Sequence, residues 1–248
     1  PAEWQEHPPK KRLKIAVCTE SPIHTKISDE ARQAVTNAVT FLAQEGHEII
    51  EINYPLDGRA LIQSYYQMNG AETASMIHSI ESGLGRSVAQ NELEPISWVL
   101  LEYGKKVSAA NYIQSLHVWD HAAITMEELF QTVDLFLSPT TAFTAPEIST
   151  DLQSDEIRAK MAGINECNEQ ESLAVISEMF EESLKITPYT QLANLTGQPA
   201  ISLPTHISEE GLPLGIQFMA ARGREDLLFQ IGEIFENHQK FYLPPSYQ

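Results

Sequence analysis

The sequence lacks several features that mark membrane, secreted and nucleic-acid-binding proteins. It contains no run of about 18 or more apolar residues, so we expect no membrane-spanning helix and no membrane partner. It has only two cysteines, Cys18 and Cys167, which lie far apart and favour a reducing compartment such as the cytoplasm over a disulfide framework. Basic residues number 16 against 34 acidic ones, and the formal net charge of -18 argues against nucleic acid as a partner.

Common metal, cofactor and nucleophile motifs are also absent. His117 and His121 are four residues apart on a predicted helix, but Val118 follows the first histidine and zinc needs a third ligand. There is no Cys-x-x-Cys pair and no phosphate loop, and the glycines near Gly83 lack a dinucleotide fingerprint. A Ser-His-Asp triad is disfavoured because no nucleophile-elbow motif is present. We therefore predict no metal and no cofactor.

The composition that remains is that of a globular domain. Hydrophobic residues make up 42% of the 248 residues and charged residues 20%, enough for one large domain or two small ones. The excess of acid is most simply explained by solubility, although attraction of a cationic substrate is an alternative. Pro8-Pro9 predicts an extended linker over residues 1–12, and the proline-rich end predicts a tail over residues 241–248.

The first part of the chain has a strand–helix–strand pattern. The apolar run Leu13 to Val17 predicts a buried strand, and Ser28 is a good N-cap for a helix that ends at Gly46. The residues from Glu48 to Ile52 are again strand-like. Such a unit favours two parallel strands joined by a right-handed crossover.

Helical periodicity then dominates up to residue 131, which predicts a helical insertion over residues 59–131. Beyond it, Val133 to Leu137 reads as a strand that is followed by the polar residues Ser138-Pro-Thr-Thr141. We expect a loop from Thr144 to Arg158 and an amphipathic helix from Glu166 to Leu184.

The remaining chain is organised around one stretch with strong local signals. A short helix begins after Pro188 and ends at Gly197, because glycine tolerates a left-handed backbone. A strand follows from Ala200 to Leu203 and is closed by Pro204. The prediction is then a polar turn, a second strand near Leu214 and a last helix. In total we predict an α/β fold: a mixed β-sheet of about five strands flanked by helices, with strands near residues 13, 48, 133, 200 and 214.

Five of these stretches occur together and in order in a known family. They are Leu13-Lys-Ile-Ala-Val-Cys-Thr-Glu-Ser-Pro22, Leu137-Ser-Pro-Thr140, Asn194-Leu-Thr-Gly-Gln-Pro-Ala200, Gly211-Leu-Pro-Leu-Gly215 and Gly223-Arg-Glu-Asp-Leu-Leu228. In this order they resemble the C-terminal part of the amidase signature family, from Leu13 to Phe235. The resemblance implies that residues 13–240 are the C-terminal portion of the amidase signature fold.

The family's catalytic segment has no counterpart in this sequence. Family members use a serine nucleophile, a second serine on a cis peptide and a lysine base, carried by a Gly/Ser-rich segment and an upstream lysine. No such run is present, and Ser82-Gly-Leu-Gly-Arg-Ser87 has the wrong order. The resemblance thus implies a fragment of an amidase that hydrolyses a carboxamide through an acyl-serine, with no catalytic residue of its own and inactive alone.

This interpretation also makes predictions about partners. We expect a small amide substrate of the parent enzyme, pairing with a missing N-terminal half, and self-association through unpaired strand edges. One alternative within the family is the amidotransferase subunit that acts on charged transfer RNA. Another, of a different class, is a non-catalytic α/β module that binds a small molecule.

Candidate substrate-pocket residues come from two places. Thr140 and Thr141 follow a strand, and ligands in open α/β sheets bind beyond the carboxyl ends of strands. Tyr189, Thr190 and Gln191 begin the short helix of the central stretch, which in the family lies near the substrate channel. The plainer interpretations are a polar turn for the threonines and helix capping for the second group.

Overall fold

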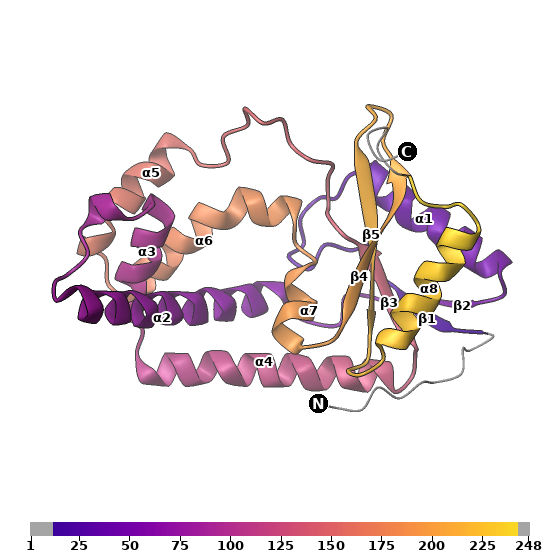
Figure 1. Ribbon diagram of the computed structural model, residues 1–248, viewed down its shortest axis with the longest axis horizontal. Coiled ribbons are helices and arrows are strands. Elements are labelled where there is room, and N and C mark those ends of the chain that lie inside the picture. Colours follow the sequence, from indigo (N-terminus) through magenta and orange to yellow (C-terminus); the bar gives the residue numbers. More distant parts are fainter. Residues whose placement is uncertain (1–11, 243–248) are drawn as a thin grey trace. The chain divides into compact units, whose positions relative to one another are not determined.

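The computed structural model describes residues 12–242, so most of the predicted linker and tail lies outside the described residues. The described chain divides into two compact units (Figure 1). The sheet unit consists of three segments: the residues up to Asp57, Ala122–Glu147, and the residues from Lys185 onward. The helical unit takes Gly58–His121 and Ile148–Leu184.

The sheet unit contains a mixed sheet of five strands in the order β2-β1-β3-β5-β4. They are β1 (Lys14–Val17), β2 (Glu48–Glu51), β3 (Leu135–Pro139), β4 (Ala200–Ile207) and β5 (Pro213–Ala220). Strand β1 is parallel to β2 and β3, whereas β5 is antiparallel to β3 and β4. The predicted α/β class, the mixed sheet and the five strand positions are confirmed.

One face of this sheet carries the hydrophobic core. Because side chains alternate along a strand, Leu135 and Leu137 of β3 share this face with Ile216 and Phe218 of β5. They pack against α1 (Asp29–Gln44) and α8 (Glu225–Asn237). Helix α1 begins where the sequence predicted, since the Ser28 hydroxyl accepts a hydrogen bond from the Ala31 N–H at 3.1 Å.

The opposite face of the sheet is more polar. Phe136, Ser138 and Gln217 lie on it, and Figure 1 draws the short helix α7 (Gln191–Thr196) on the other side of the sheet from α8. The end of α4 (Ala109–Phe130) also belongs to the sheet unit, and its Met126 is fully buried. This face, with the strand ends beside it, positions the candidate site.

The helical unit combines buried apolar side chains, such as Leu101 and Ile176, with one very close helix contact and an ion pair between helices. It comprises α2 (Gly58–Leu84), α3 (Pro95–Gly104), the start of α4, α5 (Asp155–Ala162) and most of α6 (Glu169–Ile186). Helices α2 and α3 meet at Gly70 and Gly104, where a Cβ on Gly104 would lie 1.9 Å from the Gly70 carbonyl oxygen. Arg59 of α2 donates two hydrogen bonds to the Glu181 carboxylate of α6, at 2.6 and 2.8 Å.

Several predicted boundaries were wrong, among them the start of the helix expected at Glu166, since α6 begins at Glu169. Strand β3 begins at Leu135 rather than Val133 and includes Ser138 and Pro139. Strand β4 continues through Pro204 to Ile207, because it is an edge strand and a bulge between Leu203 and His206 removes the need for a proline N–H.

Another error concerns the expected loop from Thr144 to Arg158. Helix α5 already begins at Asp155, because the Ser154 hydroxyl accepts from the Ile157 N–H and two acids occupy the first turn. Among the described helices, none is both long and apolar enough to cross a bilayer.

Candidate functional site

The carboxyl end of β3 brings two hydroxyl groups together. The Thr140 N–H donates to the Gly215 carbonyl at 3.0 Å, which extends the pairing of β3 with β5 by one residue. The Thr140 Oγ1 lies 2.6 Å from the Ser202 Oγ of β4. Thr140 is half-buried and Ser202 is exposed, so a ligand can reach this hydroxyl pair.

Gly215 is what allows these hydroxyls to meet. It lies on β5 between the two, and a Cβ there would be 2.7 Å from the Ser202 Oγ and 3.0 Å from the Thr140 Oγ1. Any larger residue would have to displace both groups. This steric constraint explains why the last residue of the Gly-Leu-Pro-Leu-Gly stretch, Gly215, is a glycine.

The hydroxyl pair continues into a polar row across three strands. Gln217 of β5 is paired in register with Ser138 of β3 on one side and Ser202 of β4 on the other. Ser138 and Gln217 are buried, and Ser202 is the accessible end of the row. Ser202 was not among the predicted site residues, although its place between Ile201 and Leu203 in a strand indicates that it faces away from the core.

Thr141 and Tyr189 make mainly local or buried contacts. The Thr141 hydroxyl donates to the Phe143 carbonyl at 2.8 Å. Tyr189 is 1% exposed, packs with Ile27 and Ala142, and its hydroxyl donates to the Thr19 carbonyl at 3.5 Å. Its ring thus joins the loop after β1 to the loop after β3.

Thr190 and Gln191 lie at the start of α7. Thr190 occupies the N-cap position and is exposed, but its side chain makes no capping hydrogen bond. Gln191 donates its Nε2 to the Thr187 carbonyl at 2.8 Å, and its Oε1 is buried without a hydrogen-bond partner among the described residues. The structure therefore places Thr140 and Ser202 at one accessible point, with Tyr189 behind the loops.

The buried thiol near these loops is not prepared to act as a nucleophile. Cys18 directly follows β1 and is 2% exposed. Burial raises the pKa of the Cys18 thiol to about 11, so it stays protonated at neutral pH. Burial likewise raises the pKa of Tyr54 and of Tyr189 above the usual range of a phenol. All three side chains fill space, and those of Cys18 and Tyr189 also donate to backbone carbonyls.

The Asn-Leu-Thr-Gly-Gln-Pro-Ala stretch forms the C-terminal end of α7 and is held there by several hydrogen bonds. Gly197 ends the helix with a left-handed backbone at φ 75°, and the Thr196 hydroxyl donates to the Leu192 carbonyl at 2.7 Å. The Arg222 guanidinium donates to the Thr196 carbonyl. Gln198 donates its Nε2 to the Glu127 carboxylate of α4 at 3.0 Å. This stretch is therefore explained by helix termination and strand entry.

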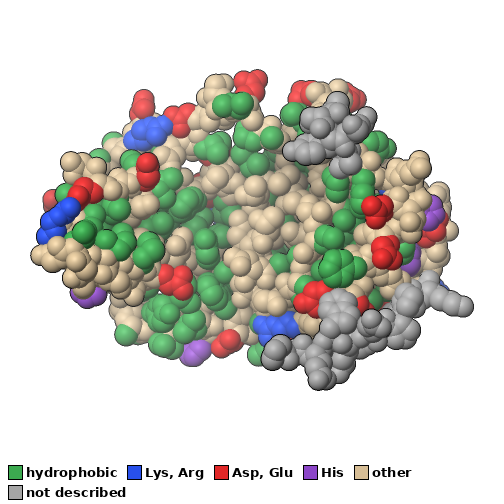
Figure 2. All heavy atoms as spheres, in the orientation of Figure 1, with side chains coloured by type: hydrophobic (Ala, Val, Ile, Leu, Met, Phe, Trp, Pro, Cys, Tyr) green, Lys and Arg blue, Asp and Glu red, His purple; other side chains and the backbone are tan. Residues whose placement is uncertain are grey.

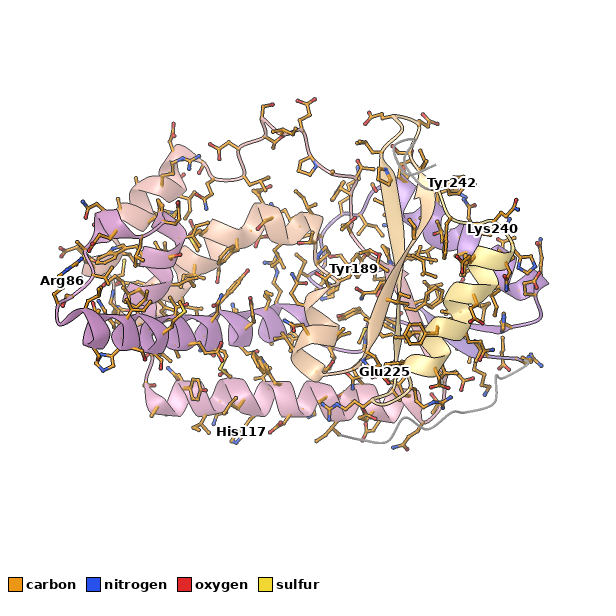
Figure 3. The ribbon with its side chains drawn as sticks, in the orientation of Figure 1. Arg86, His117, Tyr189, Glu225, Lys240 and Tyr242 are labelled. Carbon is orange, nitrogen blue, oxygen red and sulfur yellow. The ribbon has the colours of Figure 1, made fainter. Side chains whose placement is uncertain are left out.

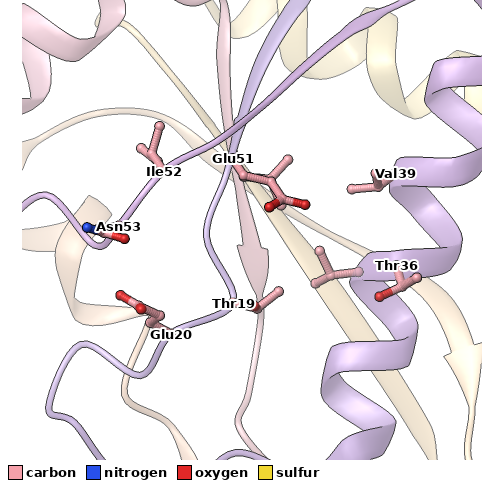
Figure 4. A pocket seen from close by; sticks show the side chains of 9 residues that line it. Thr19, Glu20, Thr36, Val39, Glu51, Ile52 and Asn53 are labelled. Carbon is pink, nitrogen blue, oxygen red and sulfur yellow. The ribbon is translucent and has the colours of Figure 1, made fainter.

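A groove of about 600 Å³ lies at the carboxyl ends of β1 and β2 (Figure 4). Glu20 and Asn53 lie on one side of it and Thr36 and Val39 of α1 on the other. Glu51 contributes a second carboxylate, and no lysine or histidine is among the described lining residues. The groove supplies hydrogen-bond acceptors and hydroxyls, and it lacks the serine–lysine pair that amide hydrolysis in this fold would use.

No three histidine, cysteine or acidic side chains of residues 12–242 converge in a way that could hold a metal ion. His117 is exposed on α4 (Figure 3). The histidines of this helix therefore do not belong to a three-ligand cluster.

Comparison with known proteins identifies the family. The amidase family model matches residues 1–229. The chain is 36% identical over 233 residues to a lipoamidase of Enterococcus faecalis, covering 93% of this chain and 32% of the relative. It is 29% identical to a 6-aminohexanoate-cyclic-dimer hydrolase of Pseudomonas sp. (strain NK87), covering 90% of this chain and 43% of the relative.

A solved structure gives the same result for the fold. The structure of a 6-aminohexanoate cyclic dimer hydrolase superposes with a TM-score of 0.76 at 27% identity, over 94% of this chain and 46% of that one. The chain thus spans between a third and a half of the length of the relatives it matches. With a family model matched over most of its length and a sheet of the same fold, the chain belongs to the amidase signature family.

Proposed function

We propose that this chain is the C-terminal part of an amidase that hydrolyses a carboxamide C–N bond through an acyl-serine intermediate. The observation that carries this proposal is the combination of family membership with the absence, in all 248 residues, of a Gly/Ser-rich nucleophile segment. A serine needs an adjacent base and preorganised donors for the developing oxyanion. In this proposal those groups come from residues outside the sequence, and the chain is inactive alone.

The chain's own contribution is a wall of the substrate pocket. Thr140 and Ser202 present two hydroxyls at an accessible strand end, where they can donate to a substrate carbonyl or accept from its N–H. We assign Thr141, Thr190 and Gln191 to the same wall, since Thr141 follows Thr140 directly and the other two open α7, the helix that precedes β4. Tyr189 is too buried to touch substrate and acts as a positioning residue, since its ring fixes the loops that carry Thr19 and Ala142.

The class of substrate is suggested by the names of the relatives. One relative is named a lipoamidase and another a 6-aminohexanoate-cyclic-dimer hydrolase, and the second name contains an aliphatic amino acid. We assign one class, an amide of an aliphatic carboxylic acid, to the parent enzyme of this chain. Its working partner is an N-terminal amidase half, and its setting is the cytoplasm, with neither nucleic acid nor membrane as a partner.

The first experiment tests whether the chain lacks the nucleophile. The purified chain is incubated with lipoamide and hexanamide, and separately with a fluorophosphonate probe that labels activated serines. We expect neither product nor label from the chain alone. We expect both when it is mixed with, or fused to, an N-terminal half that carries the family's Gly/Ser-rich segment. Labelling of the isolated chain would refute the assignment, because a reactive serine would then lie within these residues.

The second experiment tests the pocket wall in the reconstituted enzyme. Ser202→Ala and Thr140→Val each remove one hydroxyl, and we expect KM for lipoamide to rise roughly threefold to tenfold while kcat changes little. Thr132→Val is the matched control, since the Thr132 hydroxyl donates locally to the Leu129 carbonyl and lies outside the hydroxyl pair. Unchanged KM in both site variants would remove Thr140 and Ser202 from the pocket.

A further inference from the structure

A second cavity lies on the α1–α8 side of the sheet, within the sheet unit. Its volume is about 300 Å³, and its walls come from α1, β4, α8 and the residues just after α8. The rings of Phe41 and Phe235 form an apolar wall, with their centroids 5.0 Å apart in an edge-to-face contact. Sites for small molecules begin at about this volume, so the cavity suits a ligand of a few carbon atoms.

The polar part of this cavity is basic and contains no acid. Lys240 holds its ammonium group 5.2 Å from the centroid of the Phe41 ring, and it makes no ion pair with any described residue. Asn37, Gln44 and Tyr242 add side chains that can donate hydrogen bonds. Figure 3 labels Lys240 and Tyr242 just beyond the end of α8.

This basic character is unusual for the molecule. The chain has 34 acidic residues and 16 basic ones, and Asp and Glu side chains occur at many separate places on the face drawn in Figure 2. None of them lines this cavity. A lysine that makes no ion pair with a described residue, in a cavity that no described carboxylate lines, attracts anions.

Thr205 provides an independent indication of a ligand. It lies in the bulge of β4, where Pro204 and Thr205 together face a single residue of β5. Thr205 is 8% exposed, and its Oγ1 is buried without a hydrogen-bond partner among the described residues. A buried hydroxyl left unpaired costs about 1–3 kcal/mol, so native proteins nearly always provide a partner for it. Here that partner would enter through the cavity that Thr205 lines.

We propose that this cavity binds a small organic carboxylate with a short aliphatic chain. The ligand's carboxylate accepts hydrogen bonds from the Lys240 ammonium and the Thr205 hydroxyl. Its aliphatic part packs on the rings of Phe41 and Phe235. An amine would be repelled by Lys240. A phosphate dianion would meet one cation and an apolar wall, which satisfies half of its charge. The inference does not depend on the proposed amidase activity.

The test measures binding of hexanoate to the chain by calorimetry and by methyl NMR of threonine-labelled protein. We expect a Kd on the order of 1 mM, with a shift of the Thr205 methyl signal that saturates along with the heat. Lys240→Met should weaken binding roughly tenfold and Thr205→Val roughly threefold. Lys26→Met is the matched control, because Lys26 is an exposed lysine of the same unit that does not line the cavity. It should leave the Kd unchanged.

Two further ligands and one shortened chain make the result decisive. Hexan-1-ol and hexylammonium should bind at least about tenfold more weakly than hexanoate, since neither places a negative charge beside Lys240. Equal binding of hexanoate to the wild type and to Lys240→Met would overturn the proposal. A second outcome would also overturn it: hexanoate binds a shortened protein that ends at Tyr242 but does not bind the full chain. The cavity would then be occupied by residues 243–248 of the protein itself.

Discussion

The two units of this protein are stabilised in different ways and carry different information. All five stretches that resemble the amidase signature family fall in the sheet unit, between residues 13 and 57, 122 and 147, or after residue 185. The helical unit contains none of them. Its helices follow from apolar periodicity, and it is joined by side-chain pairs such as Arg59 with Glu181 and Tyr66 with Phe180, whose rings are stacked 5.3 Å apart. The five stretches by which the sequence resembles the family therefore all lie in the sheet unit, although the family model also matches across the helical unit.

The largest expected effect tests whether the helical unit depends on a single contact. Gly104→Ala would place a Cβ 1.9 Å from the Gly70 carbonyl oxygen and 2.5 Å from its carbonyl carbon. Backbone atoms cannot move aside, so α3 must separate from α2. We expect a loss of about 3 kcal/mol or more in the free energy of unfolding, measured by urea denaturation.

The control for this variant is another helical glycine. Gly83→Ala in α2 meets no atom within 4 Å and should stabilise the protein by up to about 1 kcal/mol through helix propensity. Hydrogen exchange then locates the damage of Gly104→Ala. Loss of protection confined to α2 and α3 sharpens the contrast between the units. Equal loss in β3 and β5 would show that the two units unfold as one.

A smaller effect is expected at the helix end in the sheet unit. Gly197 has φ 75°, and a Cβ there would lie 3.3 Å from the Arg222 guanidinium, so Gly197→Ala should cost roughly 1–2 kcal/mol. Gly232→Ala in α8 is the matched variant, because its nearest neighbour would be the Ile201 Cδ1 at 4.0 Å. It should be neutral or slightly stabilising. A loss at Gly197 as large as at Gly104 would contradict the expectation that the α2–α3 contact is the more sensitive of the two positions.

The smallest effect is a dependence on pH that belongs to the sheet unit. Burial holds the pKa of His47 below its ordinary value of 6.5, and its Nδ1 accepts the Leu13 N–H at 3.1 Å in the neutral form. The folded state thus binds fewer protons than the unfolded state. Stability from this group is complete above pH 6.5 and is lost as the pH falls through the folded pKa.

This dependence is measured by thermal unfolding between about pH 7 and pH 5. His47→Gln cannot titrate, so its melting temperature should fall less over this range than that of the wild type. Glu30 does not interfere, since the hydrogen bond from His206 at 2.5 Å lowers its pKa from 4.5, and its contribution is lost only below that value. Parallel curves for the two proteins would remove His47 as the source.

Most of the fold could be predicted from the sequence, because its signals are local. Ser28, Gly46, Pro95 and Gly197 mark element ends by backbone chemistry that is nearly independent of the surroundings. The errors arose where tertiary position overrides local preference. Pro204 ends a strand in general, but it is tolerated in β4 because of the bulge and the edge.

The candidate site was harder to predict for a related reason. Thr140 could be placed at a strand end from the sequence alone. Its partner Ser202 is 62 residues away, and only the pairing of β4 with β5 and of β5 with β3 brings them together. The role of Gly215 depends on the same pairing. Tyr189 is polar at its tip yet belongs to the core, which its residue type does not reveal.

The proline in β4 also limits how this protein can associate with other chains. A foreign strand that adds to an exposed sheet edge needs an uninterrupted series of donors and acceptors. Pro204 offers no N–H, and its carbonyl already accepts from the Tyr242 N–H at 2.8 Å. Along β4, the edge offered to an incoming strand is therefore interrupted at Pro204, after the four residues Ala200–Leu203. This short stretch favours one matched partner segment over open-ended fibre growth.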